Sequence, residues 1–152
     1  MADHFFDTSA ISKHYQAETG TAKVDALLSV GGTGQLISRL SVVELHSALA
    51  KKVRTGHLSQ GDFLLLARRF RGDVATRRLR VVRLLVAHFQ SAERLIRRIG
   101  LTQNLRTLDA VQLAVALSLN EPGRPITFVC ADHALCAIAA AEGLPTVNPE
   151  VP

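Results

Sequence analysis

The sequence predicts an α/β fold in which a central parallel sheet of about four to five strands is flanked by helices. Short runs rich in β-branched and apolar residues alternate with longer runs of helical periodicity, and glycine or proline breaks separate them. The chain has 152 residues, of which 47% are hydrophobic and 20% charged, so it can bury one sizeable core. We therefore expect a single domain over residues 1–152.

The first half of the chain is expected to supply two strands and four helices. In order these are a strand at His4–Phe6, helices at Ser9–Gln16 and Thr21–Val30, a strand at Gln35–Arg39, and helices at Ser41–Arg54 and Ser59–Arg71 that end near Gly56 and Gly72. The glycine-rich break Gly31–Gly34 separates a helix from the second strand. Val42, Leu45, Leu49 and Val53 recur at helical spacing, which indicates one apolar face.

The second half repeats this alternation. In order it is expected to form a strand at Leu79–Arg83, helices at Val86–Arg98 and Thr107–Leu119, a strand at Ile126–Ala131, a helix at Ala134–Glu142 and an edge strand at Thr146–Val147. Ile126–Ala131 is the most strand-like segment, because it is mostly β-branched or apolar and follows the loop Glu121–Pro125.

Composition and charge narrow the class of protein. The chain has 18 Lys and Arg residues against 13 Asp and Glu residues, and this surplus of +5 suits a polyanionic partner. Met1–His4 lacks the basic start of an export signal, and no apolar run reaches membrane-spanning length, so we expect a soluble cytoplasmic protein with no membrane contact. Cys130 and Cys136 are interpreted as buried apolar thiols, because two cysteines make neither a disulfide framework nor a zinc site.

Four acidic residues occupy the starts of predicted helices. Asp7 and Asp132 directly follow strands and can act as N-caps, while Asp109 lies in a first helical turn. Ser41–Glu44 fits a capping box, with Ser41 as the N-cap. Taken singly, each acid is therefore explained by the chemistry of helix starts.

The joint placement of the four acids indicates a shared binding site, which capping alone does not explain. In a parallel sheet the carboxyl ends of the strands and the following helix starts share one edge, where ligands bind. Two carboxylates ~4 Å apart repel by roughly 4 kcal/mol at an effective dielectric constant near 20, so such a group needs protons or a cation. Oxygen ligands without His or Cys favour Mg²⁺ or Mn²⁺, which also bind phosphate.

This arrangement predicts hydrolysis of a phosphodiester by a metal-activated water. One carboxylate can orient or deprotonate the water while the others hold the metal, and the product carries a 5′-phosphate if the 3′-oxygen leaves. We expect Asp7, Asp109 and Asp132 to be direct ligands, and Glu44 either to bind the metal or to act on the water.

Ordered motifs along the chain resemble the PIN-domain ribonucleases, and within them the VapC-type toxins of bacterial toxin–antitoxin pairs. The motifs are Phe5–Ala10, Ser41–Leu45, Leu108–Ala114, Phe128–Asp132 and Ala139–Pro149. None of them is specific alone, but their order covers essentially the whole chain.

The resemblance implies a single PIN-like nuclease domain that cleaves RNA endonucleolytically with Mg²⁺ or Mn²⁺ and acts as a homodimer inhibited by a cognate antitoxin. It matches the acids of that family's site to Asp7, Glu44, Asp109 and Asp132. It also implies that Thr8 and Ser9 support a metal-bound carboxylate. Cys130 departs from the family, which commonly has Thr or Ser at this position.

Basic residues are dense enough to offer an RNA-backbone surface, although a solvated helical face is an equally good interpretation. The groups are Arg68, Arg69 and Arg71; Arg77, Arg78, Arg80 and Arg83; and Arg94, Arg97 and Arg98. Arg106, which precedes the helix that carries Asp109, is expected to contact an RNA phosphate near the metal.

Two other classes compete with the ribonuclease. The first is a noncatalytic RNA- or partner-binding module of the same fold, which metal binding without turnover would favour. The second is a phosphoacceptor domain or an aspartate-dependent phosphatase. The phosphatase needs a second Asp where Ser9 stands, and the phosphoacceptor needs a late Lys, whereas the last Lys is Lys52.

Overall fold

The computed structural model describes residues 2–152 and contains one five-stranded parallel sheet, as the sequence predicts. The strands are β1 (Asp3–Phe6), β2 (Gln35–Ser38), β3 (Arg80–Val82), β4 (Ile126–Val129) and β5 (Thr146–Val147), in the spatial order β3-β2-β1-β4-β5. All four strand pairs are parallel. The chain starts in the central strand, winds outward to β3, and then crosses back to β4 beside β1. The order of connection therefore reverses between β1 and β4, which is where such sheets bind ligands.

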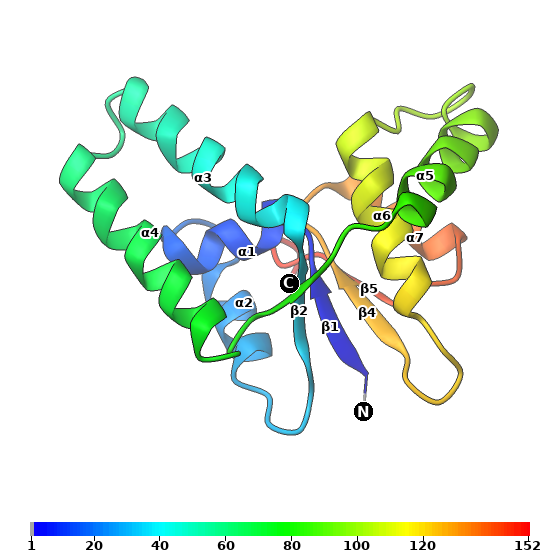
Figure 1. Cartoon of the computed structure of the whole chain (residues 1–152), viewed down its shortest axis with the longest axis horizontal. Coiled ribbons are helices and arrows are strands. Elements are labelled where there is room, and N and C mark those ends of the chain that lie inside the picture. The colour runs from blue at the N-terminus through cyan, green and yellow to red at the C-terminus, as the bar shows by residue number, and fades with distance from the viewer. Residues whose placement is uncertain (1) are drawn as a thin grey trace.

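Helices cover both faces of the sheet. They are α1 (Thr8–Tyr15), α2 (Thr21–Leu28), α3 (Arg39–Arg54), α4 (Gln60–Ala75), α5 (Val86–Ile99), α6 (Thr107–Leu119) and α7 (His133–Ala141). Helices α1–α4 lie on one side and α5–α7 on the other, and the α3–α4 hairpin projects away from the sheet (Figure 1).

The strands divide the core into two layers. In β1, Phe5 packs with Phe128 and Leu113 under α5–α7, whereas its neighbour Phe6 packs with Ile37 under α1–α4. Successive side chains of a strand point to opposite faces, so adjacent phenylalanines of a strand covered on both sides enter different layers. This double burial holds the carboxyl ends of the strands in place beneath the site described below.

Helix α3 corrects one of our predictions. The helix begins at Arg39, and its N-cap is Ser38, whose Oγ accepts a hydrogen bond from the Ser41 backbone N–H at 3.1 Å. Ser41 is thus the residue that donates to the cap, and the predicted capping box from Ser41 to Glu44 is wrong. Glu44 lies in the second turn of α3 and is free for another role.

Helix α4 corrects a second prediction, because it continues past Gly72 to Ala75. A mid-helix glycine costs about 1 kcal/mol relative to alanine. The contacts beyond it offset this cost: the Tyr15 hydroxyl donates to Asp73 Oδ2 at 2.6 Å, and Arg78 lies 3.5 Å from the same carboxylate.

Between residues 2 and 152, none of the helices is both long and apolar enough to span a bilayer. Cys130 and Cys136 are both buried free thiols, in agreement with the interpretation from composition.

Candidate active site

Asp7 links β1 to α1 at the centre of the sheet edge. It is the N-cap of α1, and its Oδ2 accepts hydrogen bonds from the Ser9 backbone N–H at 3.0 Å and from the Ser9 hydroxyl at 2.6 Å. Its residue surface is only 5% exposed. Burial, together with the charges of Asp109 and Glu44, raises the pKa of Asp7 to about 6, although the Ser9 hydrogen bonds act in the opposite direction. Asp7 therefore takes up a proton at a higher pH than an ordinary aspartate does.

Glu44 reaches the same edge from α3, and two donors fix it. Thr8 Oγ1 and Gln112 Nε2 each donate to Glu44 Oε1 at 2.9 Å. These two donors come from α1 and α6, so three helices meet at one carboxylate oxygen. The direction in which Glu44 points is thus set by tertiary contacts rather than by its own helix.

Gln112 lies buried where α1, α3 and α6 meet at Glu44, and it is only 1% exposed. Its Oε1 accepts from the Ser38 hydroxyl at 2.6 Å. The two hydrogens of its Nε2 are shared among Glu44 Oε1, Ser41 Oγ at 2.8 Å and Thr8 Oγ1 at 3.1 Å. A buried amide with every polar atom bonded orients its partners firmly.

Asp109 lies in the first turn of α6, one helical turn before Gln112. Arg106 Nε donates to Asp109 Oδ2 at 2.9 Å, and another Arg106 nitrogen lies 3.8 Å from Asp132 Oδ2. The Arg106 side chain is 68% exposed, so this pairing is open to solvent. The arginine therefore supplies positive charge between two of the acids.

Asp132 follows β4 and is the N-cap of α7, with Oδ1 accepting from the Leu135 backbone N–H at 3.0 Å. Its own backbone N–H donates to Cys130 Sγ at 3.3 Å, and the Ser9 hydroxyl lies 3.8 Å from the same sulfur. The thiol thus occupies the place of the hydroxyl expected here and still contacts both neighbours.

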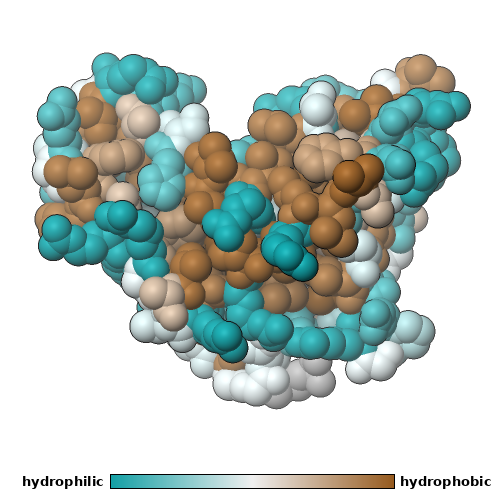
Figure 2. Space-filling model, viewed as in Figure 1, coloured by the Kyte–Doolittle hydropathy of each residue, from teal (hydrophilic) through white to brown (hydrophobic). Residues whose placement is uncertain are grey.

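A pocket of about 640 Å³ contains most of these groups. It is lined by Asp7, Thr8, Ser9, Glu44, Ser47, Ala48, Lys51, Arg54, Arg106, Leu108 and Asp109. The structure thus brings three of the four predicted acids, both hydroxyls and Arg106 into one pocket, while Asp132 lies outside its lining and connects through Arg106. The pocket opens between the α3–α4 hairpin and the α5–α6 pair, where the molecule is notched (Figures 1 and 2).

The donor chemistry of the pocket fits a hard divalent cation. Its three carboxylates carry hard oxygen donors, and their mutual repulsion contributes to the raised pKa of Asp7. Within residues 2–152, no three acidic, histidine or cysteine side chains converge closely enough to enclose an ion, and Arg106 balances the charge of Asp109 instead. A cation would therefore compete with Arg106 for Asp109.

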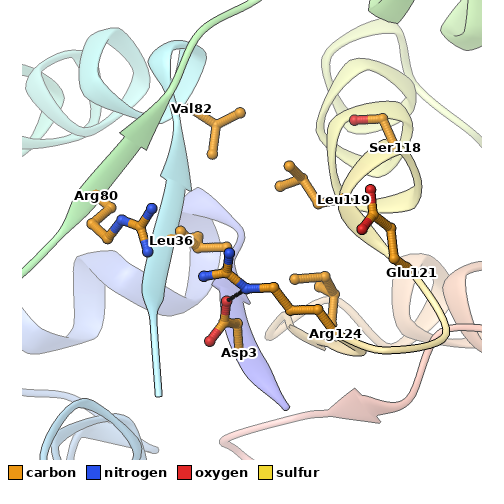
Figure 3. A pocket seen from close by; sticks show the side chains of 9 residues that line it. Asp3, Leu36, Arg80, Val82, Ser118, Leu119, Glu121 and Arg124 are labelled. Atoms are coloured by element: carbon orange, nitrogen blue, oxygen red, sulfur yellow. Dashed lines mark hydrogen bonds and ion pairs between the residues drawn. The ribbon is translucent and has the colours of Figure 1, made fainter. Parts of the chain in front are cut away.

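A second pocket, of about 190 Å³, lies at the opposite end of the strands (Figure 3). Its acid, Asp3, is already satisfied, because Arg124 Nε donates to one oxygen and the Gly34 backbone N–H to the other, both at 2.6 Å. Arg124 and Gly34 together lower the pKa of Asp3 against the opposing effect of burial. This pocket is lined by two acids, Asp3 and Glu121, whereas three acids line the pocket at the carboxyl edge, so the carboxyl edge is the stronger candidate site.

The model of one protein family, the PIN domain, matches residues 4–141, a span that includes all four acids. The chain belongs to the PIN domain family. Two curated relatives, Ribonuclease VapC45 and Ribonuclease VapC49 of Mycobacterium tuberculosis, are each 34% identical over 119 residues, which is 78% of this chain and 78% of the relative.

Solved structures show the same fold. VapC20 of Mycobacterium tuberculosis, described as a sarcin-ricin loop cleaving toxin, superposes with a TM-score of 0.69 at 15% identity, covering 97% of this chain and 100% of that one. FitAcB from Neisseria gonorrhoeae gives 0.65 at 17% identity, covering 98% and 99%. PAE2754 from Pyrobaculum aerophilum gives 0.65 at 20% identity, covering 96% and 84%.

Sequence analysis missed Gln112, which lies at the centre of the hydrogen bonds of this PIN domain's pocket. The sequence contains a signal, since Gln112 is the one polar residue in Ala110–Ala116, a run otherwise made of small and apolar residues. The structure buries this whole run. A polar side chain inside such a run must find partners, which marks it as a candidate for a functional network.

Proposed function

We propose that this PIN domain is a divalent-cation-dependent endoribonuclease and the toxin of a toxin–antitoxin pair. One observation carries the proposal: the carboxylates of Asp7, Glu44 and Asp109 line a single pocket at the point where the sheet reverses its order of connection. The names of the curated relatives, both ribonucleases, support RNA as the substrate.

In this proposal Asp7, Asp109 and Asp132 hold Mg²⁺ or Mn²⁺, with Glu44 as a further ligand or as the group that orients the attacking water. A bound divalent cation would supply charge neutralisation at the scissile phosphate and a lower pKa for the attacking water. Ser9 orients Asp7 through its 2.6 Å hydrogen bond, and Thr8 orients Glu44. The resemblance to the PIN-domain ribonucleases implies the same supporting role for both hydroxyls.

Arg106 has a second task in this scheme. When a cation binds Asp109, the Arg106 guanidinium loses its carboxylate partner. The guanidinium can then donate two hydrogen bonds to an RNA phosphate. The same residue thus balances the acids in the free protein and contacts RNA in the complex.

The proposed partners are an RNA, a cognate antitoxin and a second copy of the chain, in the cytoplasm. Support for the homodimer comes from three apolar residues at the start of α5: Leu85 is 51% exposed, Val86 74% and Phe89 52%. Figure 2 shows a broad hydrophobic area between the α3–α4 hairpin and helices α5–α7, where β3 leads into α5 in Figure 1. Exposed apolar surface of this kind marks an interaction site. A change of Phe89→Glu should convert a dimer to a monomer in light scattering.

The direct test is cleavage of RNA by the purified protein. We expect new 5′-phosphate ends with Mg²⁺ or Mn²⁺ and none with a chelator, together with growth arrest on expression that a neighbouring reading frame relieves. Cation binding without turnover on a broad panel of RNAs would instead favour a noncatalytic RNA- or partner-binding module.

A further inference from the structure

The active-site pocket has an acidic end and a basic end. Its acids lie where α1, α3 and α6 meet, and its wall then continues along α3 through Ser47, Ala48, Lys51 and Arg54. These positions follow Glu44 at helical spacing and so form one stripe. With a rise of about 1.5 Å per residue, Lys51 lies about 10 Å and Arg54 about 15 Å from Glu44 along the helix axis.

The two cations at the basic end are available for binding. Within residues 2–152, neither the Lys51 ammonium nor the Arg54 guanidinium has an ion pair, and both residues are exposed. Arg106, by contrast, is paired with Asp109 and Asp132. The free positive charge of the pocket is therefore concentrated at the end remote from the acids.

We propose that Lys51 and Arg54 bind backbone phosphates that flank the scissile bond, so that α3 forms a track for a single RNA strand. The inference rests on the proposed function and adds a binding surface to it. A pocket whose wall extends well beyond the acids suits a ligand longer than one phosphodiester, and phosphate contacts supply most of the sequence-independent affinity for a nucleic acid.

A structural explanation competes with this one. Cations in the last turn of a helix interact favourably with its negative end, and the last turn of α3 contains Lys51, Lys52 and Arg54. Lys52 provides the matched control, because it shares this turn and this charge but does not line the pocket.

The test compares Lys51→Ala, Arg54→Ala, the double variant and Lys52→Ala. Binding of a labelled mixed-sequence RNA decamer is measured by fluorescence anisotropy in EDTA across a salt series. Each lost phosphate contact should reduce the slope of log affinity against log salt by about 0.7, hence by about 1.4 for the double variant, whereas Lys52→Ala should keep the wild-type slope.

Cleavage supplies the second readout. With Mg²⁺, the double variant should show a several-fold higher KM for the decamer, while kcat changes little. On a dinucleotide, which is too short to reach the C-terminal end of α3, the double variant should show wild-type kinetics. The proposed phosphate contacts of Lys51 and Arg54 would be wrong if the double variant kept the wild-type slope and KM. They would also be wrong if Lys52→Ala changed the slope and KM as much as the double variant does. If the slopes fall as expected in the variants but the wild-type protein never cuts the decamer, the proposed function is overturned, while the phosphate contacts of Lys51 and Arg54 are supported.

Discussion

Gln112 Nε2 donates to Glu44 Oε1 at 2.9 Å, and this contact joins the helix that carries Asp109 to the helix that carries Glu44. The amide is suited to the position because it accepts from Ser38 and donates to Glu44 at the same time. An amide carries an acceptor and an uncharged donor at any pH, whereas a carboxyl donates only when it is protonated. The contact explains how carboxylates from two helices keep a fixed relationship in the pocket.

Two replacements of Gln112 should therefore change different properties: Gln112→Leu the free energy of unfolding, and Gln112→Glu the pH dependence of cleavage. In Gln112→Leu the buried hydroxyl of Ser38 and the carboxylate of Glu44 lose a partner, which should cost about 1–3 kcal/mol of unfolding free energy. Gln112→Glu places a second carboxyl against Glu44, so that the pair retains a proton and the pH profile of cleavage moves upward.

Denaturant unfolding and pH–rate profiles measure these two effects. Gln90→Leu, an exposed position on α5, is the control and should change neither. If Gln112→Leu and Gln112→Glu had identical pH profiles, Gln112 would have only a structural role.

Asp7 should destabilise the metal-free protein at neutral pH. Burial raises its pKa from 3.8 to about 6, so the folded state holds a proton that the unfolded state has lost between these values. The contribution of Asp7 to stability therefore falls as pH rises from about 4 to about 6, by on the order of 3 kcal/mol.

Asp7→Asn should remove this dependence. In EDTA the variant should melt at a higher temperature than wild type near pH 8, and the difference should vanish near pH 4. Thermal unfolding monitored by circular dichroism measures the difference. A variant less stable than wild type at both pH values would contradict the assigned effect of burial.

Arg106 should compete with a cation. Because its guanidinium pairs with Asp109 and lies near Asp132, Arg106→Ala should tighten Mn²⁺ binding in calorimetry while weakening RNA binding. Arg124→Ala, which breaks the ion pair with Asp3 at the opposite end of the strands, is the control and should alter neither affinity. Weaker Mn²⁺ binding in Arg106→Ala would show that the arginine assists the cation rather than competing with it.

The sequence predicts all five strands and the direction of the sheet, because β-rich runs and glycine breaks are local signals. It also predicts Asp7 and Asp132 as N-caps, since each acid immediately follows a strand. The position of both residues at one edge then follows from parallel topology alone.

Long-range contacts explain what the sequence did not predict. Ser38, rather than Ser41, caps α3, because only the structure shows that β2 ends at the cap itself. The partners of Gln112 come from residues up to 104 positions away in the chain. No local pattern encodes such a junction.

The central claim is that the carboxylates of the pocket hold a cation needed for RNA cleavage. The most direct measurement is the Mn²⁺ dependence of RNA cleavage by Asp7→Asn and Asp109→Asn, with Glu93→Gln on the exposed face of α5 as the control for lost charge. We expect both aspartate variants to stay folded and to lose more than the roughly 100-fold that a supporting residue contributes, and the control to match wild type. Full activity of both aspartate variants, or wild-type cleavage that persists in a chelator, would contradict the account.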